Sequence, residues 1–140
     1  MSQARRTIWF CASLTLALSV VFLPLGMQWL ELRSTFESYS ACLVAQDYVR
    51  AFDKTSAGFR SVTPLASFVA QQHALVESAG PIASVTRLNT NVYVEAWPFE
   101  WRGTVCARLS YRTGDLLIRY ALVYEDNGWK ISAYDSDVHS

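Results

Sequence analysis

The sequence contains little of what most enzyme and metal sites are built from. Its two histidines, His73 and His139, are not part of a sequence cluster of His, Cys and carboxylate residues of the kind that holds a metal ion. The chain has no nucleophile elbow, phosphate-binding loop, dinucleotide fingerprint or Cys-x-x-Cys pair. Twelve basic and twelve acidic residues cancel, so no overall field would attract a nucleic acid. We therefore expect no metal, no cofactor, no catalytic residue and no nucleic-acid partner.

The longest feature that is present is a charge-free apolar run over residues 7–30, TIWFCASLTLALSVVFLPLGMQWL. As an α-helix this run would be about 36 Å long, enough to cross a hydrocarbon core of about 30 Å. Trp9 and Trp29 would lie about 30 Å apart, the spacing of the two interfacial aromatic belts. Arg5 and Arg6 precede the run and favour a cytoplasmic N-terminus.

A cleaved signal peptide is the alternative, because it shares a basic start and an apolar run. The run is longer than a usual signal core, and residues 24–26, Pro-Leu-Gly, offer no small residue three positions before a cut. We therefore predict a cytoplasmic segment at 1–6, a transmembrane helix at 7–30 and an extracytoplasmic domain at 31–140. In a bacterial cell this predicts a single-pass inner-membrane protein with a periplasmic C-terminal domain.

Two further helices are expected after the run. A capping-box pattern at residues 34–37, Ser-Thr-Phe-Glu, predicts a helix over 34–54. Thr63-Pro64 and Gly80-Pro81 are start and stop signals for a second helix. In a single helix over 34–54, one arc is apolar and is expected to face the core: Ala41, Val44, Ala45, Tyr48, Val49, Ala51 and Phe52.

The opposite arc of that helix carries a second apolar series. Leu32, Phe36, Tyr39 and Leu43 recur with the 3.5-residue spacing of a coiled-coil seam. Because the first arc already supplies a core face, we expect this series to contact another membrane protein or a second copy of the chain. The alternatives are that the series rests on the lipid headgroups or folds against the second helix.

Beyond Pro81 the apolar period changes to two, which is typical of β-strands. The expected strands are 84–97, 104–112, 116–125 and 129–135. The predicted fold class is α+β: an N-terminal transmembrane helix, then two helices packed on one face of a four-stranded antiparallel meander. Two-residue turns at Thr113-Gly114 and Asn127-Gly128 place one apolar set on the core face: Tyr111, Ile118, Tyr120, Leu122, Trp129 and Ile131.

The reverse face of the predicted sheet is polar. Under this register Arg108 lies directly opposite Arg119, an unfavourable pairing unless something neutralises it. Glu95 would lie nearby and could do so. A solvated network is one interpretation, and a patch for an acidic partner or anion is the other. Cys106 also points to this face, away from the helix that carries Cys42, so we expect no disulfide between them.

The closing hairpin, residues 126–131 with the sequence DNGWKI, is similar to the ending of many NTF2-like and cystatin-like domains. The resemblance covers about residues 36–135. It implies a helix-and-meander cone, and a membrane-anchored location outside the bacterial inner membrane. Because members range from isomerases to interaction modules, the family implies no single activity.

Enzymatic members of that superfamily use carboxylates and tyrosines inside the cone. Here Asp47 and Asp53 fall on the polar arc of the first helix, and Tyr120 and Tyr124 have the positions of core-filling aromatics. We therefore predict a non-enzymatic interaction or assembly subunit of a membrane-associated complex. The alternative is a ligand-binding or weakly catalytic domain with a pocket between sheet and helices.

Overall fold

In a computed structural model, the described residues are 3–96 and 99–136, so Trp97, the expected end of the first strand, lies outside them. The described residues form four helices followed by four strands. They are α1 (Gln3–Val44), α2 (Tyr48–Asp53), α3 (Ala57–Val62), α4 (Leu65–Ala79), β1 (Ile82–Glu95), β2 (Glu100–Tyr111), β3 (Gly114–Glu125) and β4 (Gly128–Ser136).

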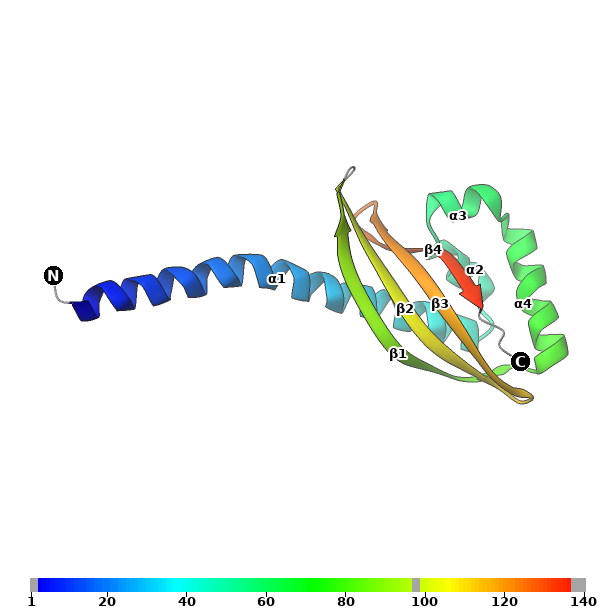
Figure 1. The fold of residues 1–140 in the computed structure, drawn as a ribbon. Coiled ribbons are helices and arrows are strands. Elements are labelled where there is room, and N and C mark those ends of the chain that lie inside the picture. The colour runs from blue at the N-terminus through cyan, green and yellow to red at the C-terminus, as the bar shows by residue number, and fades with distance from the viewer. Residues whose placement is uncertain (1–2, 97–98, 137–140) are drawn as a thin grey trace.

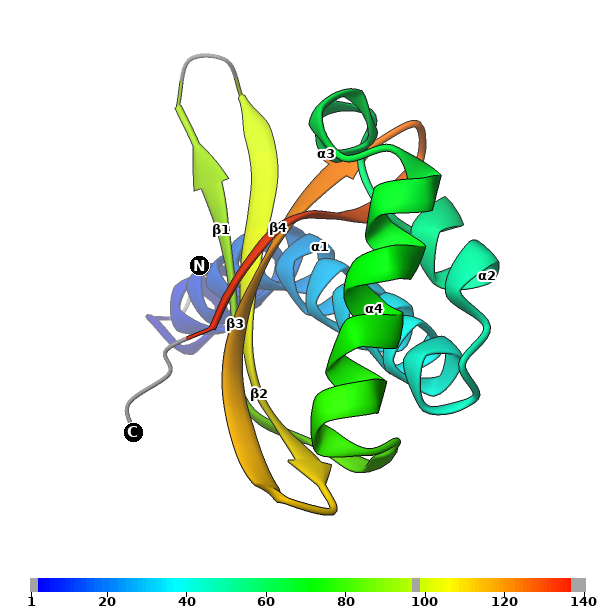
Figure 2. The ribbon, with the colours of Figure 1, turned by 90° about the vertical axis from the view of Figure 1, so that its right-hand side faces the viewer.

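The four strands form an antiparallel meander in the order β1-β2-β3-β4. The helices lie on one side of this sheet, with α1 crossing it and the N-terminal part of α1 projecting far out of the domain (Figures 1 and 2). The α+β class and the antiparallel meander are confirmed. Among the described residues α1 alone is long and apolar enough to cross a membrane.

The helix predicted over residues 34–54 does not exist as one element. Its capping-box signal lies inside α1, so there is no helix start for Glu37 to cap. Glu37 instead forms an ion pair with Arg33, one turn earlier in the same helix (3.0 Å). A cap can act only at a helix start, where backbone N–H groups lack partners. The chain instead turns after Val44, with Gln46 at a positive φ of 59°, and Asp47 caps α2.

The side chains predicted to contact a partner are the centre of the domain core. Leu32, Phe36, Tyr39 and Leu43 are only 0 to 3% exposed and pack onto the sheet. The ring centroids of Phe36 and Tyr39 lie 5.2 and 5.7 Å from that of Tyr120. The predicted partner contact is therefore wrong, because the chain's own sheet covers this face.

The helix arc expected to face the core does so only in part. Tyr48 and Ala51 are buried, whereas Val44 and Val49 are exposed. The prediction treated residues 34–54 as a single helix, so the apolar residues of α2 were used to choose the core-facing side of α1 as well. Because the chain turns after Val44, the core-facing sides of α1 and α2 are independent of each other.

Both hairpin turns are centred one residue earlier than predicted. In the last hairpin Tyr124 pairs with Trp129, and Asp126 and Asn127 carry the positive φ values of the turn (50° and 60°). Moving a turn centre by one residue shifts the cross-strand pairing by two, so every side chain keeps its face. The predicted core face is therefore confirmed, with Ile118, Tyr120, Leu122, Trp129 and Ile131 all buried.

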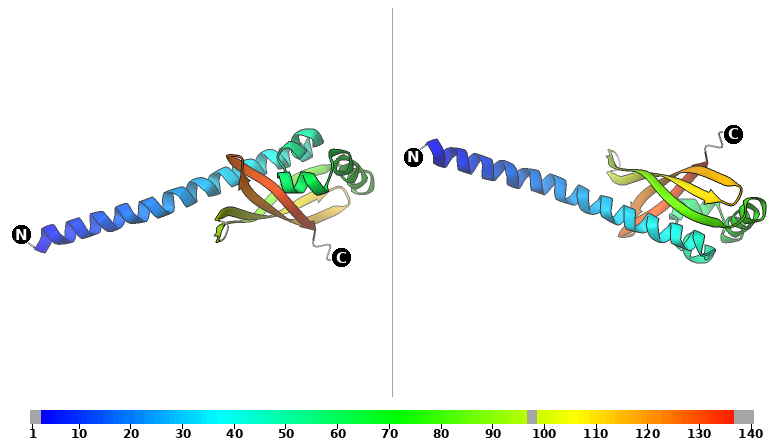
Figure 3. Two further views of the ribbon diagram at one scale, coloured as in Figure 1. Left: turned by 90° about the horizontal axis from the view of Figure 1, so that it is seen from above. Right: turned by 90° about the horizontal axis from the view of Figure 1, so that it is seen from below.

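The domain begins directly at the end of the apolar run, without a linker. The indole N–H of Trp129 donates to the side-chain oxygen of Gln28 (3.0 Å), and the Arg87 guanidinium lies over Trp29 at 5.8 Å from the ring centroid. Leu32 then lies against Gly103 on β2. Both panels of Figure 3 show α1 entering the domain as a continuous rod.

Candidate functional site

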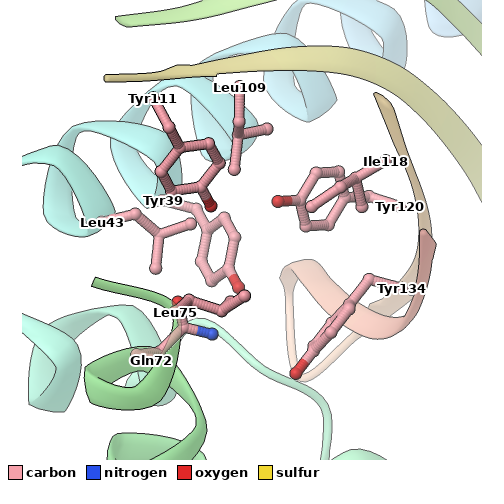
Figure 4. A pocket seen from close by; sticks show the side chains of 9 residues that line it. All are labelled: Tyr39, Leu43, Gln72, Leu75, Leu109, Tyr111, Ile118, Tyr120 and Tyr134. Carbon is pink, nitrogen blue, oxygen red and sulfur yellow. The ribbon is translucent and has the colours of Figure 1, made fainter. Parts of the chain in front are cut away.

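One candidate site is a narrow cavity between the sheet, α1 and α4 (Figure 4). The space open to the centre of a water molecule is about 20 Å³, which is room for about one water. Nine side chains line it: Tyr39, Leu43, Gln72, Leu75, Leu109, Tyr111, Ile118, Tyr120 and Tyr134. The hydroxyls of Tyr111 and Tyr120 point into it from the sheet.

The tyrosines of this cavity are held in the neutral form. Burial raises the pKa of Tyr39 and of Tyr120, and repulsion from neighbouring tyrosinates would raise both further. Burial also raises the pKa of Tyr111 and of Tyr134. Near neutral pH these groups can donate or accept hydrogen bonds, as Tyr134 does to the Gln71 side-chain oxygen (3.1 Å), but they cannot act as bases.

The predicted direct pair of arginines on the reverse face is not formed. Arg119 pairs across the sheet with Cys106, and Arg108 pairs with Leu117 and reaches Asp115 at 4.0 Å. The two-residue shift in pairing makes Arg108 and Arg119 diagonal neighbours on that face, so the predicted direct pairing is wrong. Glu95 does not lie beside them, because it forms an ion pair with Arg102 near the β1–β2 turn.

Asp47 and Asp53, the carboxylates considered from the sequence as possible general bases, are either paired or exposed to solvent. Asp47 accepts the backbone N–H of Arg50 (3.3 Å) and pairs with the Arg50 side chain (3.3 Å). Asp53 is exposed. Cys42 and Cys106 are both free thiols, as the predicted faces require.

A second candidate site is a basic cleft of about 360 Å³ between α1, α2 and β4. Its two walls differ in character, because α1 supplies a hydroxyl and a thiol while α2 and β4 supply the charges. The lining residues, which we call the basic cleft, are Ser38, Cys42, Arg50, Asp53, Lys54 and Lys130. Three cations against one carboxylate give the cleft a net charge of +2.

The backbone brings two of these cations together. Thr55 and Ile131 form an isolated parallel bridge, in which the Ile131 N–H donates to the Lys54 carbonyl (2.9 Å) and the Ser56 N–H donates to the Ile131 carbonyl (2.7 Å). Thr55 and Ile131 point inward and are fully buried. Lys54 and Lys130, one position earlier on each side, therefore lie beside each other on the outside.

Among the described residues, no carboxylate oxygen lies within 4.0 Å of the ammonium group of Lys54 or Lys130. Adjacent like charges without a counter-charge disfavour the free domain and favour an anion. The sequence carries no signal for this pairing, because it joins a helix end to a distant strand through one bridge.

The residues expected at the membrane interface are partly described. Trp29 lies between two guanidinium groups, with Arg33 at 5.7 Å and Arg87 at 5.8 Å from its ring centroid. Trp9 is exposed on the distal part of α1. The side chains of Arg5 and Arg6 lie outside the described residues.

No family model and no curated protein matches this sequence. Solved structures do match the fold, among them Aln2 from a Streptomyces species, with a TM-score of 0.55 and 12% sequence identity. The match covers 76% of this chain and 87% of the Aln2 chain. At this identity the likeness concerns the fold alone.

Proposed function

We propose that this chain is a single-pass inner-membrane protein, cytoplasmic at its N-terminus, whose NTF2-like domain outside the membrane is a non-enzymatic interaction subunit. The domain receives an acidic segment of a partner protein in the basic cleft. The observation that carries the proposal is the placement of Lys54 beside Lys130 in the basic cleft, with no carboxylate oxygen of the described residues within 4.0 Å of either ammonium group.

The membrane anchor is supported by the surface of α1. Every side chain from residue 7 to residue 19 is exposed, although this stretch is strongly apolar. A soluble protein would rarely leave so long an apolar surface in water, whereas lipid would cover it. The NTF2-like assignment is supported by the helix-and-meander arrangement, by the closing hairpin and by the likeness to the Aln2 fold.

A non-enzymatic role is supported by the tyrosine-lined cavity. Typical small-molecule sites enclose about 300–1,000 Å³, and this cavity admits about one water. Its titratable groups are tyrosines, which are protonated at neutral pH, and burial raises the pKa of Tyr39 and of Tyr120 still further. The position that holds a substrate in a catalytic cone is here filled by aromatic rings.

The basic cleft suits a partner that is already confined to the same membrane. Solvent-exposed ion pairs contribute about 0.2–1 kcal/mol each, and Arg50 is already paired with Asp47, so Lys54 and Lys130 together could supply up to about 2 kcal/mol. That is too little for tight binding from solution. It is enough to select among partners whose effective concentration the membrane has raised.

The test is charge reversal in the full-length chain in native membranes. A photo-cross-linking residue at Ser38, on the wall of the cleft, should give an adduct with a partner protein. Lys54→Glu with Lys130→Glu should abolish that adduct. The matched control is Arg60→Glu with Arg112→Glu, which changes the net charge equally at exposed sites outside the cleft.

If the control pair also abolishes the adduct, the effect is one of net charge and the cleft is not the site. If neither pair affects it, the partner does not use these lysines. Either result contradicts the proposal.

A small polar ligand in the tyrosine-lined cavity is a second candidate function. It is favoured by the two hydroxyls, of Tyr111 and Tyr120, that converge in Figure 4. Such a ligand would have to displace water and move Leu75 or Gln72 aside. Ligand-induced thermal stabilisation that is lost in Tyr120→Phe, while the basic cleft variants retain it, would support this candidate.

A further inference from the structure

The β1–β2 hairpin exposes large apolar side chains near its end. Tyr93 is 47% exposed, Val94 46% and Phe99 74%, and Trp101 is half-buried. An isolated exposed apolar residue is normal at a protein surface, but a cluster of this kind marks a contact.

The hairpin lies at the end of the domain that faces the anchor. Figure 1 and both panels of Figure 3 show its end on the side from which α1 projects. Leu32, two residues beyond the charge-free run, lies against Gly103, which pairs with Val92. The pairs Tyr93–Arg102 and Val94–Trp101 continue the hairpin from that level.

Apolar side chains occupy both faces of the hairpin end. Val94 and Trp101 form a cross-strand pair, so they share a face, and Tyr93, the neighbour of Val94, points to the opposite face. A protein partner packed on the sheet would cover one face. A fluid apolar medium surrounds both, and the interfacial layer of a bilayer is the region that tyrosine and tryptophan prefer.

The charges at this end compensate one another. Arg102 pairs with Glu95 and, at 2.8 Å, with Glu100. Three charged groups are therefore gathered into one compact cluster with a net charge of −1. This arrangement lowers the cost of bringing the hairpin up to the lipid headgroups, because none of the three charges has to be desolvated alone.

We infer that the end of the β1–β2 hairpin is a second membrane contact, in which Tyr93, Val94 and Phe99 lie in the lipid interface beside α1. This inference rests on the proposed anchoring of α1. Two contacts, the helix and the hairpin, would limit the tilt of the domain relative to the membrane surface.

The experiment measures lipid contact at single positions of the full-length chain. Single cysteines replace Tyr93, Phe99, Val62 or Leu14 in a background in which Cys11, Cys42 and Cys106 are serine. Each is labelled with an environment-sensitive fluorophore in vesicles of phosphatidylethanolamine and phosphatidylglycerol. Quenchers are nitroxide lipids, labelled near the headgroup or deep in the acyl chain, and aqueous iodide. The same thermal unfolding midpoint in every labelled chain shows that each is folded.

Val62 is the matched control, since it is apolar and 80% exposed but lies on α3, away from the anchor (Figure 1). We expect the shallow nitroxide lipid to quench labels at 93 and 99 several times more than the label at 62. Quenching at 93 and 99 equal to that at 62 would overturn the inference. Labels at 93 and 99 that are shielded from iodide yet not quenched by lipid would also overturn it, and would indicate a protein contact.

Leu14 reports on the anchor separately. A label there should be quenched by the deep nitroxide lipid whether or not the hairpin touches the membrane. Loss of that signal would contradict the proposed anchoring, whereas its presence with unquenched labels at 93 and 99 would refute the hairpin contact alone.

Discussion

Gly103 is where α1 crosses the sheet, and the closeness of that crossing can be tested. A Cβ atom added at Gly103 would overlap the Cδ1 atom of Leu32 and would lie 3.1 Å from the carbonyl oxygen of Asn91. Leu32 is fully buried, so its side chain has little freedom to move aside. Gly103→Ala should therefore force α1 away from β2.

The size of the effect follows from overpacking. One extra methyl group in a filled core costs about 1–3 kcal/mol of the free energy of unfolding. Leu32→Ala alone should cost about 2–5 kcal/mol, because it leaves a cavity. In the double variant the methyl group at 103 enters that cavity, so the combined loss should be at least about 1 kcal/mol smaller than the sum of the single losses.

The assay is denaturant unfolding of the full-length chain in mild detergent, followed by tryptophan fluorescence. Gly128→Ala is the matched control, since a Cβ there meets nothing within 4 Å, and it should change stability by less than about 0.5 kcal/mol. If Gly103→Ala is as stable as the control, or if the two losses simply add, α1 does not pack on β2 in this way.

Three other outcomes are expected. Phe36→Ala should lower the free energy of unfolding by about 3–5 kcal/mol, because the ring is buried. In the same denaturant assay, Ser38→Ala on the exposed side of the same helix should lower it by less than about 0.5 kcal/mol. Equal losses would contradict the burial of Phe36. Burial raises the pKa of Tyr39 and of Tyr120, so above about pH 10 the unfolded chain loses tyrosine protons that both residues retain in the folded state. Stability is therefore full below that pH and should fall by about 1.4 kcal/mol per pH unit for each. Free energies of unfolding measured against pH should have a slope about 1.4 kcal/mol per pH unit smaller in Tyr39→Phe than in the parent chain, and an unchanged slope would contradict the burial of Tyr39. Membranes washed with alkaline carbonate should retain the full-length chain, and protease added outside the inner membrane should digest the domain. A shorter mature chain released by the wash would mean that the apolar run is cleaved.

The turn residues and the alternation of apolar and polar residues made the sheet predictable from the sequence. The Asn127-Gly128 pair predicted a hairpin, and β4 begins at Gly128, one residue before the expected start. The turn centre was misplaced because positive φ falls on Asp126 and Asn127, and both residue types tolerate that conformation. The core face was still correct, since the error in pairing was an even number of residues.

The first helix was predicted less well because periodicity identifies an apolar face without identifying what covers it. Leu32, Phe36, Tyr39 and Leu43 do form a continuous apolar face, as their spacing indicates. Residues 34–54 were treated as one helix whose opposite arc already supplied a core face, so the sheet was not expected to cover this face. A helix that continues out of a membrane span needs no new start signal.

The candidate sites depended on contacts that a single sequence does not encode locally. The Arg108–Arg119 patch required a pairing that was two residues in error. The basic cleft required one bridge between Thr55 and Ile131, two residues with no pattern in common. The basic cleft is therefore a consequence of tertiary packing, which the sequence pattern of neither segment indicates.

The rigid entry of α1 into the domain constrains any partner of the basic cleft. Cys42, on the α1 wall of the cleft, lies twelve residues beyond Leu30, the end of the apolar run, which is about 18 Å along a helix. If the apolar run spans the membrane upright, as proposed, the cleft would lie at that height above the bilayer, because no linker intervenes. An extended chain spans at most about 3.3–3.6 Å per residue, so the proposed acidic segment would have to stand at least about six residues from its own membrane anchor to reach Lys54 and Lys130. The proposal therefore predicts that partners with shorter juxtamembrane segments do not bind in the cleft, whatever their charge.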